Sequence, residues 1–285
     1  MKTISRRNPM ERIDLHVHTV ASDGTLTARE VVRSARDIGL RALALTDHDS
    51  VGSVKEGMEA AREAGVAFVS GVELTCLRHG KEVHVLGYHV DPEASSLVAY
   101  MECVERIRQR NSRVAVDNLV KLGLDISWEE HQAYCLKPQR GGWPLINLLK
   151  EKGYVRNYPE YFDKYFGPGR PAYIPPNYPA ISLAIRAIRE AGGIAVLAHP
   201  ASYMDEGEVV DEAWLRALIA EGLKGLEAFS PYNNGRDPDV FSRLAERLGL
   251  LSTGGSDFHG SFTEGRSLGG VEVGYKLFEA LELNY

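Results

Sequence analysis

Nine side chains that can bind metal ions lie at or near the ends of predicted strands. Six are histidines, in a chain that has only nine histidines. Neutral imidazole is the commonest metal ligand in proteins, so this concentration needs a reason. One ion takes about four to six donors, so nine donors predict two or three ions. The nine are His16, His18, Asp23, His48, Glu73, His84, His199, Asp257 and His259.

Clusters of this kind most often clamp the oxygens of a phosphate ester. They also lower the pKa of a bound water, so that hydroxide is available at neutral pH to attack phosphorus. The residue types therefore predict hydrolysis of a phosphate ester by a metal-activated hydroxide.

Two pairs of donors have a spacing of two residues. His16 and His18 form one pair, and Asp257 and His259 form the other, after the glycine-rich stretch 252–256. In a strand, this spacing points both side chains to the same face, where they can hold one ion. A histidine pair on a solvated strand face has the same pattern.

Each single donor also has an ordinary structural interpretation. Asp23 is in a turn sequence and could simply form that turn. Glu73 could be a surface charge, and His84 a core residue among β-branched neighbours. His48 and His199 each follow an apolar stretch. Seven donor groups at successive strand ends would require seven coincidences, so together they favour a metal site.

Asp47, next to His48, could orient an imidazole from outside the cluster. Capping of the following helix by Asp49 or Ser50 is compatible with this. The three other histidines, His79, His89 and His131, are not assigned to the metal set.

Strands and helices alternate along most of the chain, as in a parallel sheet whose ligand site lies at the carboxyl ends of its strands. Predicted strands are 12–17, 42–45, 66–69, 82–88, 194–198, 225–229 and 250–253. Predicted helices are 27–39, 53–64, 209–221 and 238–248, the first of them capped by Thr27 and ended by Gly39.

This alternation stops between about residues 95 and 178. Helical stretches at 99–122, 128–134 and 144–152 precede an aromatic, proline-rich segment that ends at Pro171. We expect a helical insertion, 95–178, that covers the mouth of a barrel formed by 11–94 and 179–285. Arg170 would then face the substrate phosphate; a surface arginine after a turn is the alternative.

Composition limits the classes of function. The net charge is -6, which argues against a surface that binds duplex nucleic acid. Three scattered cysteines indicate a reducing cytoplasm rather than a disulfide framework. Residues 1–9 are predicted to be a disordered tail and not a signal peptide. The sequence predicts no membrane span and leaves self-association open.

The ordered motifs His16-x-His18, Thr46-Asp47-His48, Gly71-Val72-Glu73, Ala198-His199-Pro200 and Asp257-x-His259, together with Asp23 and His84, resemble those of the PHP (polymerase and histidinol phosphatase) family. The resemblance runs from about residue 13 to 260 and is greatest to the TrpH-like branch of metal-dependent phosphoesterases. It implies a distorted (β/α)7 barrel, an α/β fold, with a helical insertion.

The resemblance also implies the ligands of each ion. One ion would be held by His16, His18, Glu73 and Asp257, a second by Glu73, His84 and His199, and a third by Asp23, His48 and His259. The metals would be Mn²⁺ first, with Fe²⁺ or Zn²⁺ also compatible. The predicted catalytic residues are Glu73, Asp257 and Arg170.

Two positions depart from the family pattern. Relatives carry arginines where this chain has Trp143 and Ser202. Because arginine makes a strong bidentate contact with phosphate, their loss favours a smaller or less charged ester. Trp143 could stack on a base, although insertion core is the preferred interpretation. The predicted substrate-binding residues are Arg170, Ser202, Arg140 and Arg236; Lys137 could also compensate.

The sequence therefore predicts a phosphoesterase acting on a small phosphorylated ribose or nucleotide, as a monoester or cyclic diester. A 3',5'-nucleotide bisphosphatase or short-oligonucleotide exonuclease is an alternative. A non-phosphate metallohydrolase and a non-catalytic metal-binding module are two further hypotheses.

Overall fold

The computed structural model describes residues 11–137, 141–204, 211–232 and 239–285. The predicted N-terminal tail, Arg140 and Arg236 lie outside these residues. Within them, seven strands lie side by side in chain order. They are β1 (Ile13–Asp14), β2 (Ala42–Leu45), β3 (Ala67–Arg78), β4 (Lys81–Tyr88), β5 (Ile194–Leu197), β6 (Gly225–Phe229) and β7 (Leu251–Gly254).

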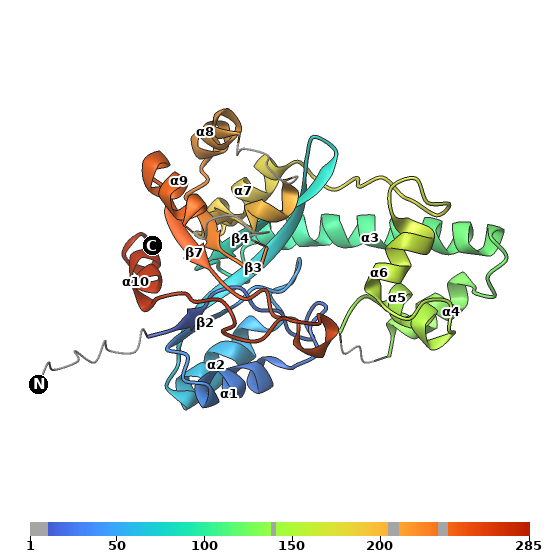
Figure 1. Ribbon diagram of the computed structural model, residues 1–285, viewed down its shortest axis with the longest axis horizontal. Coiled ribbons are helices and arrows are strands. Elements are labelled where there is room, and N and C mark those ends of the chain that lie inside the picture. The colour runs from blue at the N-terminus through green and yellow to red at the C-terminus, as the bar shows by residue number, and fades with distance from the viewer. Residues whose placement is uncertain (1–10, 138–140, 205–210, 233–238) are drawn as a thin grey trace, which may run out of the picture.

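The sheet is nearly closed into a barrel. Leu15, just after β1, donates its backbone N–H to the carbonyl of Gly254 in β7 at 3.2 Å. A parallel bridge joins Val17 and Phe258 farther along. These contacts join the first and last strands, and the predicted α/β barrel is confirmed (Figure 1).

The expectation of an all-parallel sheet is wrong at β4, which pairs antiparallel with both β3 and β5. Only His79 and Gly80 separate β3 from β4, and their φ angles are 47° and 77°. Positive φ at both positions is the geometry of a tight hairpin turn. Two residues cannot make the crossover that parallel strands need. The strand expected at 66–69 is also longer, since β3 continues through Glu73 to Arg78.

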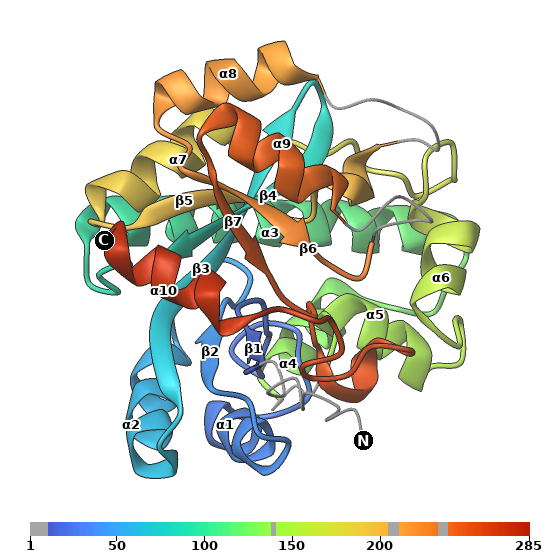
Figure 2. The same cartoon turned by 60° about the vertical axis from the view of Figure 1, so that its left-hand side comes forward.

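Helices surround the strands (Figure 2). The predicted cap of the first helix is confirmed, since Thr27 and Glu30 form a reciprocal capping box. The barrel helices are α1 (Ala28–Asp37), α2 (Val54–Ala64), α7 (Ile181–Glu190), α8 (Glu212–Glu221), α9 (Val240–Leu248) and α10 (Tyr275–Leu283).

The middle of the chain extends to one side of the barrel (Figure 1). It contains α3 (Ser95–Lys121), α4 (Trp128–Cys135), α5 (Pro144–Glu151), α6 (Tyr158–Tyr161) and a π-helical turn (Phe162–Phe166). The first half of α3 packs in the barrel core through Leu97 and Val104. Its second half packs in a separate apolar core with α5, through Leu119 and Leu149. The division at residue 95 stays a prediction, and α3 contributes to both cores.

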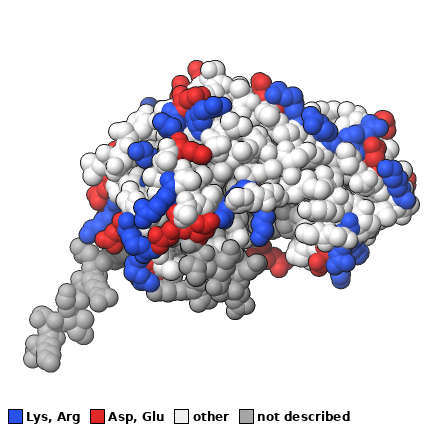
Figure 3. Space-filling model, turned by 90° about the horizontal axis from the view of Figure 1, so that it is seen from above, with Lys and Arg blue, Asp and Glu red and all other residues white. Residues whose placement is uncertain are grey.

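Charges are mixed on the face that Figure 3 shows, where Lys and Arg are interspersed with Asp and Glu. Among the described helices, none has an apolar stretch long enough to cross a membrane.

Candidate metal centre

The barrel brings the nine predicted donors together in one cluster. His16 and His18 follow β1, and His48 follows β2. Glu73 and His84 lie within β3 and β4, rather than at strand ends. His199 follows β5, while Asp257 and His259 follow β7.

Glu73 lies at the centre of the cluster and is fully buried. Its Oε2 atom lies 3.1 Å from His16 Nε2, 3.2 Å from His18 Nε2 and 3.2 Å from His48 Nδ1. A carboxylate oxygen surrounded by three imidazole nitrogens is placed to share ions with all of them.

The other oxygen, Glu73 Oε1, faces a different pair of imidazoles. It lies 3.1 Å from His84 Nδ1 and 2.9 Å from His199 Nε2. Glu73 can therefore bridge two ions, one on each oxygen.

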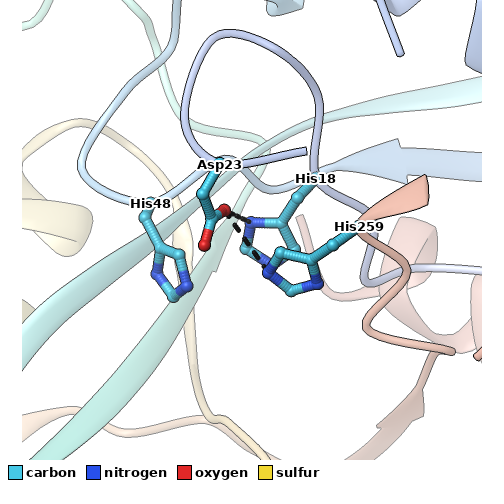
Figure 4. Close-up of side chains that lie close together, drawn as sticks. All are labelled: His18, Asp23, His48 and His259. Carbon is cyan, nitrogen blue, oxygen red and sulfur yellow. Dashed lines mark ion pairs between the residues drawn. The ribbon is translucent and has the colours of Figure 1, made fainter. Parts of the chain in front are cut away.

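Two aspartates extend the cluster beyond Glu73. Asp257 Oδ1 lies 3.1 Å from His18 Nε2 and 3.4 Å from His16 Nε2. Asp23 Oδ1 lies 3.3 Å from His259 Nε2 and 3.7 Å from His18 Nδ1. Figure 4 shows the imidazoles of His18 and His259 facing the Asp23 carboxylate, with His48 beside them.

Three overlapping groups of donors each have ligand atoms within 4.8 Å of one another. The first group equals the first predicted ligand set. The second group adds His18 to the set predicted for the third ion, which is Asp23, His48 and His259. The third group resembles the set predicted for the second ion but contains His48 in place of His199. The groups are His16, His18, Glu73 and Asp257; His18, Asp23, His48 and His259; and His48, Glu73 and His84.

Hydrogen bonding at the cluster fits a metal site. Nine buried side-chain polar atoms of the described residues lack a hydrogen-bond partner, and six of them belong to this cluster. Unpartnered buried polar atoms are costly and are rare in native proteins. The six are His16 Nε2, His18 Nδ1 and Nε2, His48 Nδ1, Glu73 Oε2 and His84 Nδ1.

Outer partners also set the tautomers of two imidazoles. His16 donates its Nδ1–H to the Glu227 carboxylate at 2.9 Å. Ser202 Oγ donates to the His199 carbonyl at 2.9 Å, so it is free to accept from His199 Nδ1, which also lies at 2.9 Å. In the neutral rings, the bare Nε2 atoms then face Glu73 oxygens. Two acceptors face each other across about 3 Å, an arrangement that a cation between them stabilises. The donor set therefore fits divalent metal ions.

The pKa values of the cluster have opposing shifts. Burial lowers the pKa of His18, but the adjacent Asp257 and Glu73 carboxylates outweigh it and raise that pKa to about 10. Burial also lowers the pKa of His84, but the Glu73 carboxylate outweighs it and raises that pKa to about 10. Burial and the charge of His18 hold the pKa of His48 well below its ordinary value. The carboxylates thus favour positive charge beside them, which bound cations would supply.

Sequence reasoning missed Glu227, in β6, which is fully buried. Its Oε1 accepts from His16, and its Oε2 accepts the backbone N–H of His199 at 2.6 Å. A carboxylate directly after a glycine-leucine pair in a buried strand was the available signal.

Asp47 does not orient an imidazole, contrary to expectation. Its carboxylate accepts from the Thr19 backbone N–H at 2.7 Å, from Ser22 Oγ at 2.7 Å and from Ser53 Oγ. Asp47 thus anchors the turn that carries Asp23.

Asp49 does not cap the following helix, and neither does Ser50; the residue before α2 is Ser53. The Asp49 carboxylate instead accepts from Arg108 at 2.6 Å and from Thr75 Oγ1 at 2.7 Å. Arg108, on α3, also places its guanidinium 4.1 Å from the centre of the Trp143 ring.

Trp143 lies beside the cluster as well as against the insertion core, since its ring centre is 6.2 Å from that of His48. Gly142, just before it, donates its backbone N–H to the Asp23 carbonyl at 2.8 Å. This part of the predicted insertion therefore contacts the edge of the cluster.

Of the predicted substrate contacts, Ser202 is exposed and hydrogen-bonds to His199. Arg170 is also exposed, and among the described residues it makes no ion pair with the cluster. Arg266, which was not among the predicted site residues, donates to Asp257 Oδ2 at 2.5 Å.

An α/β barrel that gathers histidines and carboxylates at one buried point defines a metal-dependent hydrolase. Residues 14–166 match the PHP domain, and the chain belongs to the PHP family. It is a hydrolase acting on phosphoric ester bonds, as its relatives are.

Three curated relatives are similar over most of their length. A 3',5'-nucleoside bisphosphate phosphatase of Chromobacterium violaceum is 33% identical over 92% of both chains. A phosphoribosyl 1,2-cyclic phosphate 1,2-diphosphodiesterase of Eggerthella lenta is 32% identical, covering 87% of this chain and 94% of its own. A 5'-3' exoribonuclease of Haemophilus influenzae is 30% identical, covering 87% and 90%.

Two solved structures share the fold. One, described as a metal-dependent phosphoesterase of Bifidobacterium adolescentis, has a TM-score of 0.85 and 29% identity over 96% of both chains. The other, described as an amidohydrolase of Chromobacterium violaceum with bound sulfate and no metal, has a TM-score of 0.79 and 30% identity, covering 95% of this chain and 96% of its own.

Proposed function

We propose that this phosphoesterase hydrolyses a small phosphorylated ribose or nucleotide metabolite, as a monoester and as a cyclic diester. The observation that carries the proposal is that the two arginine side chains at the edge of the cluster are already paired with aspartates. Arg108 is bound to Asp49, and Arg266 is bound to Asp257. With Trp143 and Ser202 at the two variant positions, positive charge for a second phosphate is scarce among the described residues.

The cofactors proposed are two or three divalent ions, with Mn²⁺ preferred and Fe²⁺ or Zn²⁺ compatible with the nitrogen and oxygen donors. Bound ions would supply hydroxide at neutral pH and offset charge on the phosphoryl oxygens. The three ligand sets implied by the family resemblance are supported by the distances around Glu73, Asp257 and Asp23.

The chain's own residues position the reaction. Glu73 bridges imidazoles on both of its oxygens, and Asp257 directs one oxygen to the same point. These two are the proposed catalytic carboxylates. Arg170, on its exposed segment, is proposed to contact the substrate phosphate and offset charge in the transition state. Ser202, Arg140 and Arg236 stay as proposed substrate-binding residues.

Phosphatase activity on a 3',5'-nucleoside bisphosphate is a second candidate. The Chromobacterium violaceum relative favours it, since the similarity spans 92% of both chains. The two candidates differ in the charge of the substrate, so one panel of compounds separates them.

The location proposed is the cytoplasm, because Cys76, Cys103 and Cys135 are all free thiols. The partner proposed is a small phosphorylated substrate and not duplex nucleic acid.

The test is phosphate release by the Mn²⁺-loaded protein from AMP, 3',5'-adenosine bisphosphate, ribose 5-phosphate, a ribose 1,2-cyclic phosphate, histidinol phosphate and a short RNA. Asp257→Asn is the inactive control. Release from AMP, ribose 5-phosphate or the cyclic phosphate, lost in the control, supports the proposal. Preference for the bisphosphate supports the second candidate and contradicts the first, whereas preference for the RNA contradicts both and indicates exonuclease activity.

A further inference from the structure

The two carboxylate oxygens of Asp257 face different surroundings. Oδ1 faces the imidazoles of His18 and His16. Oδ2 points away from them and accepts two hydrogen bonds, from Tyr232 Oη at 2.6 Å and from Arg266 Nη1 at 2.5 Å. Only one oxygen of this carboxylate is therefore available to an ion in the cluster.

Arg266 and Tyr232 also bind each other, which closes a triangle around Oδ2. Arg266 Nη2 donates to Tyr232 Oη at 2.6 Å, and the guanidinium lies 4.5 Å from the centre of the Tyr232 ring. The Arg266 side chain is only 19% exposed. Both of these arginine nitrogens are thus directed at partners within the protein, which argues against a primary role in binding substrate.

The same arginine holds the backbone of Asp257. Arg266 Nη1 donates to the Asp257 carbonyl at 3.1 Å, and His259 Nδ1 donates to that carbonyl at 2.8 Å. Asp257 has a φ of 49°, a left-handed conformation that costs free energy in a residue other than glycine. Arg266 therefore contacts the side chain and the carbonyl of a strained residue, and through that carbonyl it is linked to His259.

We propose that Arg266 and Tyr232 are positioning residues that restrict Asp257 to binding an ion through Oδ1 alone. The inference rests on the proposed metal-dependent function. A carboxylate with both oxygens free can chelate one ion and occupy two of its coordination positions. With Oδ2 held by Tyr232 and Arg266, Asp257 would offer a bound ion one oxygen and leave room for water or substrate. Groups that orient metal ligands from outside typically change metal affinity when they are removed.

The test is titration of the metal-free protein with Mn²⁺, followed by the electron paramagnetic resonance signal of free Mn²⁺. Arg266→Gln is expected to weaken Mn²⁺ binding about 10- to 100-fold at the ion that Asp257 would hold, because Oδ1 is then no longer aimed at the cluster. Tyr232→Phe, which removes one of the two hydrogen bonds, is expected to have a smaller effect. Arg247→Gln is the matched control, because Arg247 is an exposed arginine paired with Glu212 on the barrel exterior.

Folding is checked by the thermal melting of each metal-free variant. If Arg266→Gln does not fold, Arg266→Lys replaces it, since lysine keeps the charge but lacks the planar fork. That variant is expected to lie between the wild type and Arg266→Gln in Mn²⁺ affinity.

Unchanged Mn²⁺ affinity in a folded Arg266 variant, with a raised KM for the substrate, would overturn the inference and make Arg266 a substrate contact. This outcome leaves the proposed function intact. A second outcome separates the two proposals. If the Arg266 variants bind Mn²⁺ more weakly than the wild type, but the wild type hydrolyses no compound of the substrate panel, the positioning role is supported and the proposed function is rejected.

Discussion

The metal cluster and the apolar core of the helical insertion are both buried, but they are stabilised in different ways. At the cluster, buried histidines and carboxylates face each other, and six of their polar atoms lack hydrogen-bond partners. In the insertion, the core is apolar, and the buried His131 stacks on Trp128 at 5.3 Å. The cluster therefore fits a cationic ligand, whereas the core of the insertion is stabilised mainly by apolar burial.

This difference predicts that metal affinity and insertion stability can be changed separately. None of the nine donors lies between residues 95 and 178, and the described part of the insertion meets the cluster at its edge, through Trp143 beside His48 and Gly142 bound to Asp23. Substitutions at Glu73, Leu149, Glu227 and His131 test that separation.

Glu73→Gln is expected to abolish activity almost completely, with a loss on the order of 10³-fold from one preorganised charge. Glu73 contacts five imidazoles, so the amide would weaken more than one ion. Phosphate release and bound Mn²⁺ would be measured together. Removing the metal from wild type with a chelator should reproduce the loss, and a variant that keeps its full Mn²⁺ content would contradict the bridging role.

Leu149→Ala is expected to destabilise the protein by about 3 kcal/mol, because it leaves a cavity in the insertion core. Leu149 is fully buried. Urea denaturation would measure the loss, and Mn²⁺ affinity should not change. Leu74→Ala is the matched variant in the barrel, since Leu74 is equally buried and follows Glu73. It should lower both stability and Mn²⁺ affinity. A loss of Mn²⁺ affinity in Leu149→Ala as large as that in Leu74→Ala would show that the regions are coupled.

Glu227→Gln is expected to weaken Mn²⁺ binding about 10- to 100-fold, because it disturbs the groups that orient His16 and His199. Calorimetric titration would measure the affinity. Glu282→Gln is the control, since Glu282 also pairs with a histidine, His89 at 3.0 Å, away from the cluster. An affinity equal to that of the control would mean that Glu227 is only structural.

The smallest effect expected is a dependence of insertion stability on pH. Burial lowers the pKa of His131 below its ordinary value of 6.5. Above pH 6.5 the contribution of His131 to the free energy of unfolding is fully present. As pH falls below 6.5, His131 takes up a proton in the unfolded chain but not in the folded one, so the free energy of unfolding decreases until the pH reaches the lower pKa of the folded state. His131→Gln should flatten this dependence in urea denaturation between pH 5 and 8. An unchanged slope would exclude His131 as its source.

Local patterns identified the parts of the structure that depend on nearby residues. The strands at 42–45 and 225–229 have the predicted bounds, and the Thr27 cap lies where its sequence places it. The i, i+2 spacing did bring His16 and His18, in the segment just after β1, to the same Glu73 oxygen. In each case the relevant contacts are within a few residues or follow from strand periodicity.

Long-range partners were not predictable in the same way. Arg108 and Arg266 lie in segments with no distinctive motif, and they are joined to the site through Asp49 and Asp257. The direction of β4 was also missed, although the two-residue turn at His79 and Gly80 was a usable local signal.

The sequence by itself predicted a metal-dependent phosphoesterase, because histidine and carboxylate are scarce in buried strands unless they bind something, and the order of its motifs carried the resemblance to the PHP family. Tertiary structure alone decided which atoms face each other. Each ring has two nitrogens and each carboxylate has two oxygens, and contacts such as Glu227 with His16 and Arg266 with Asp257 choose between them. His16 and Glu227 are 211 residues apart, and Asp257 and Arg266, although nine apart, are joined by an irregular segment whose one helix is the short 3₁₀ helix Gly260–Phe262, so no local pattern encodes the choice.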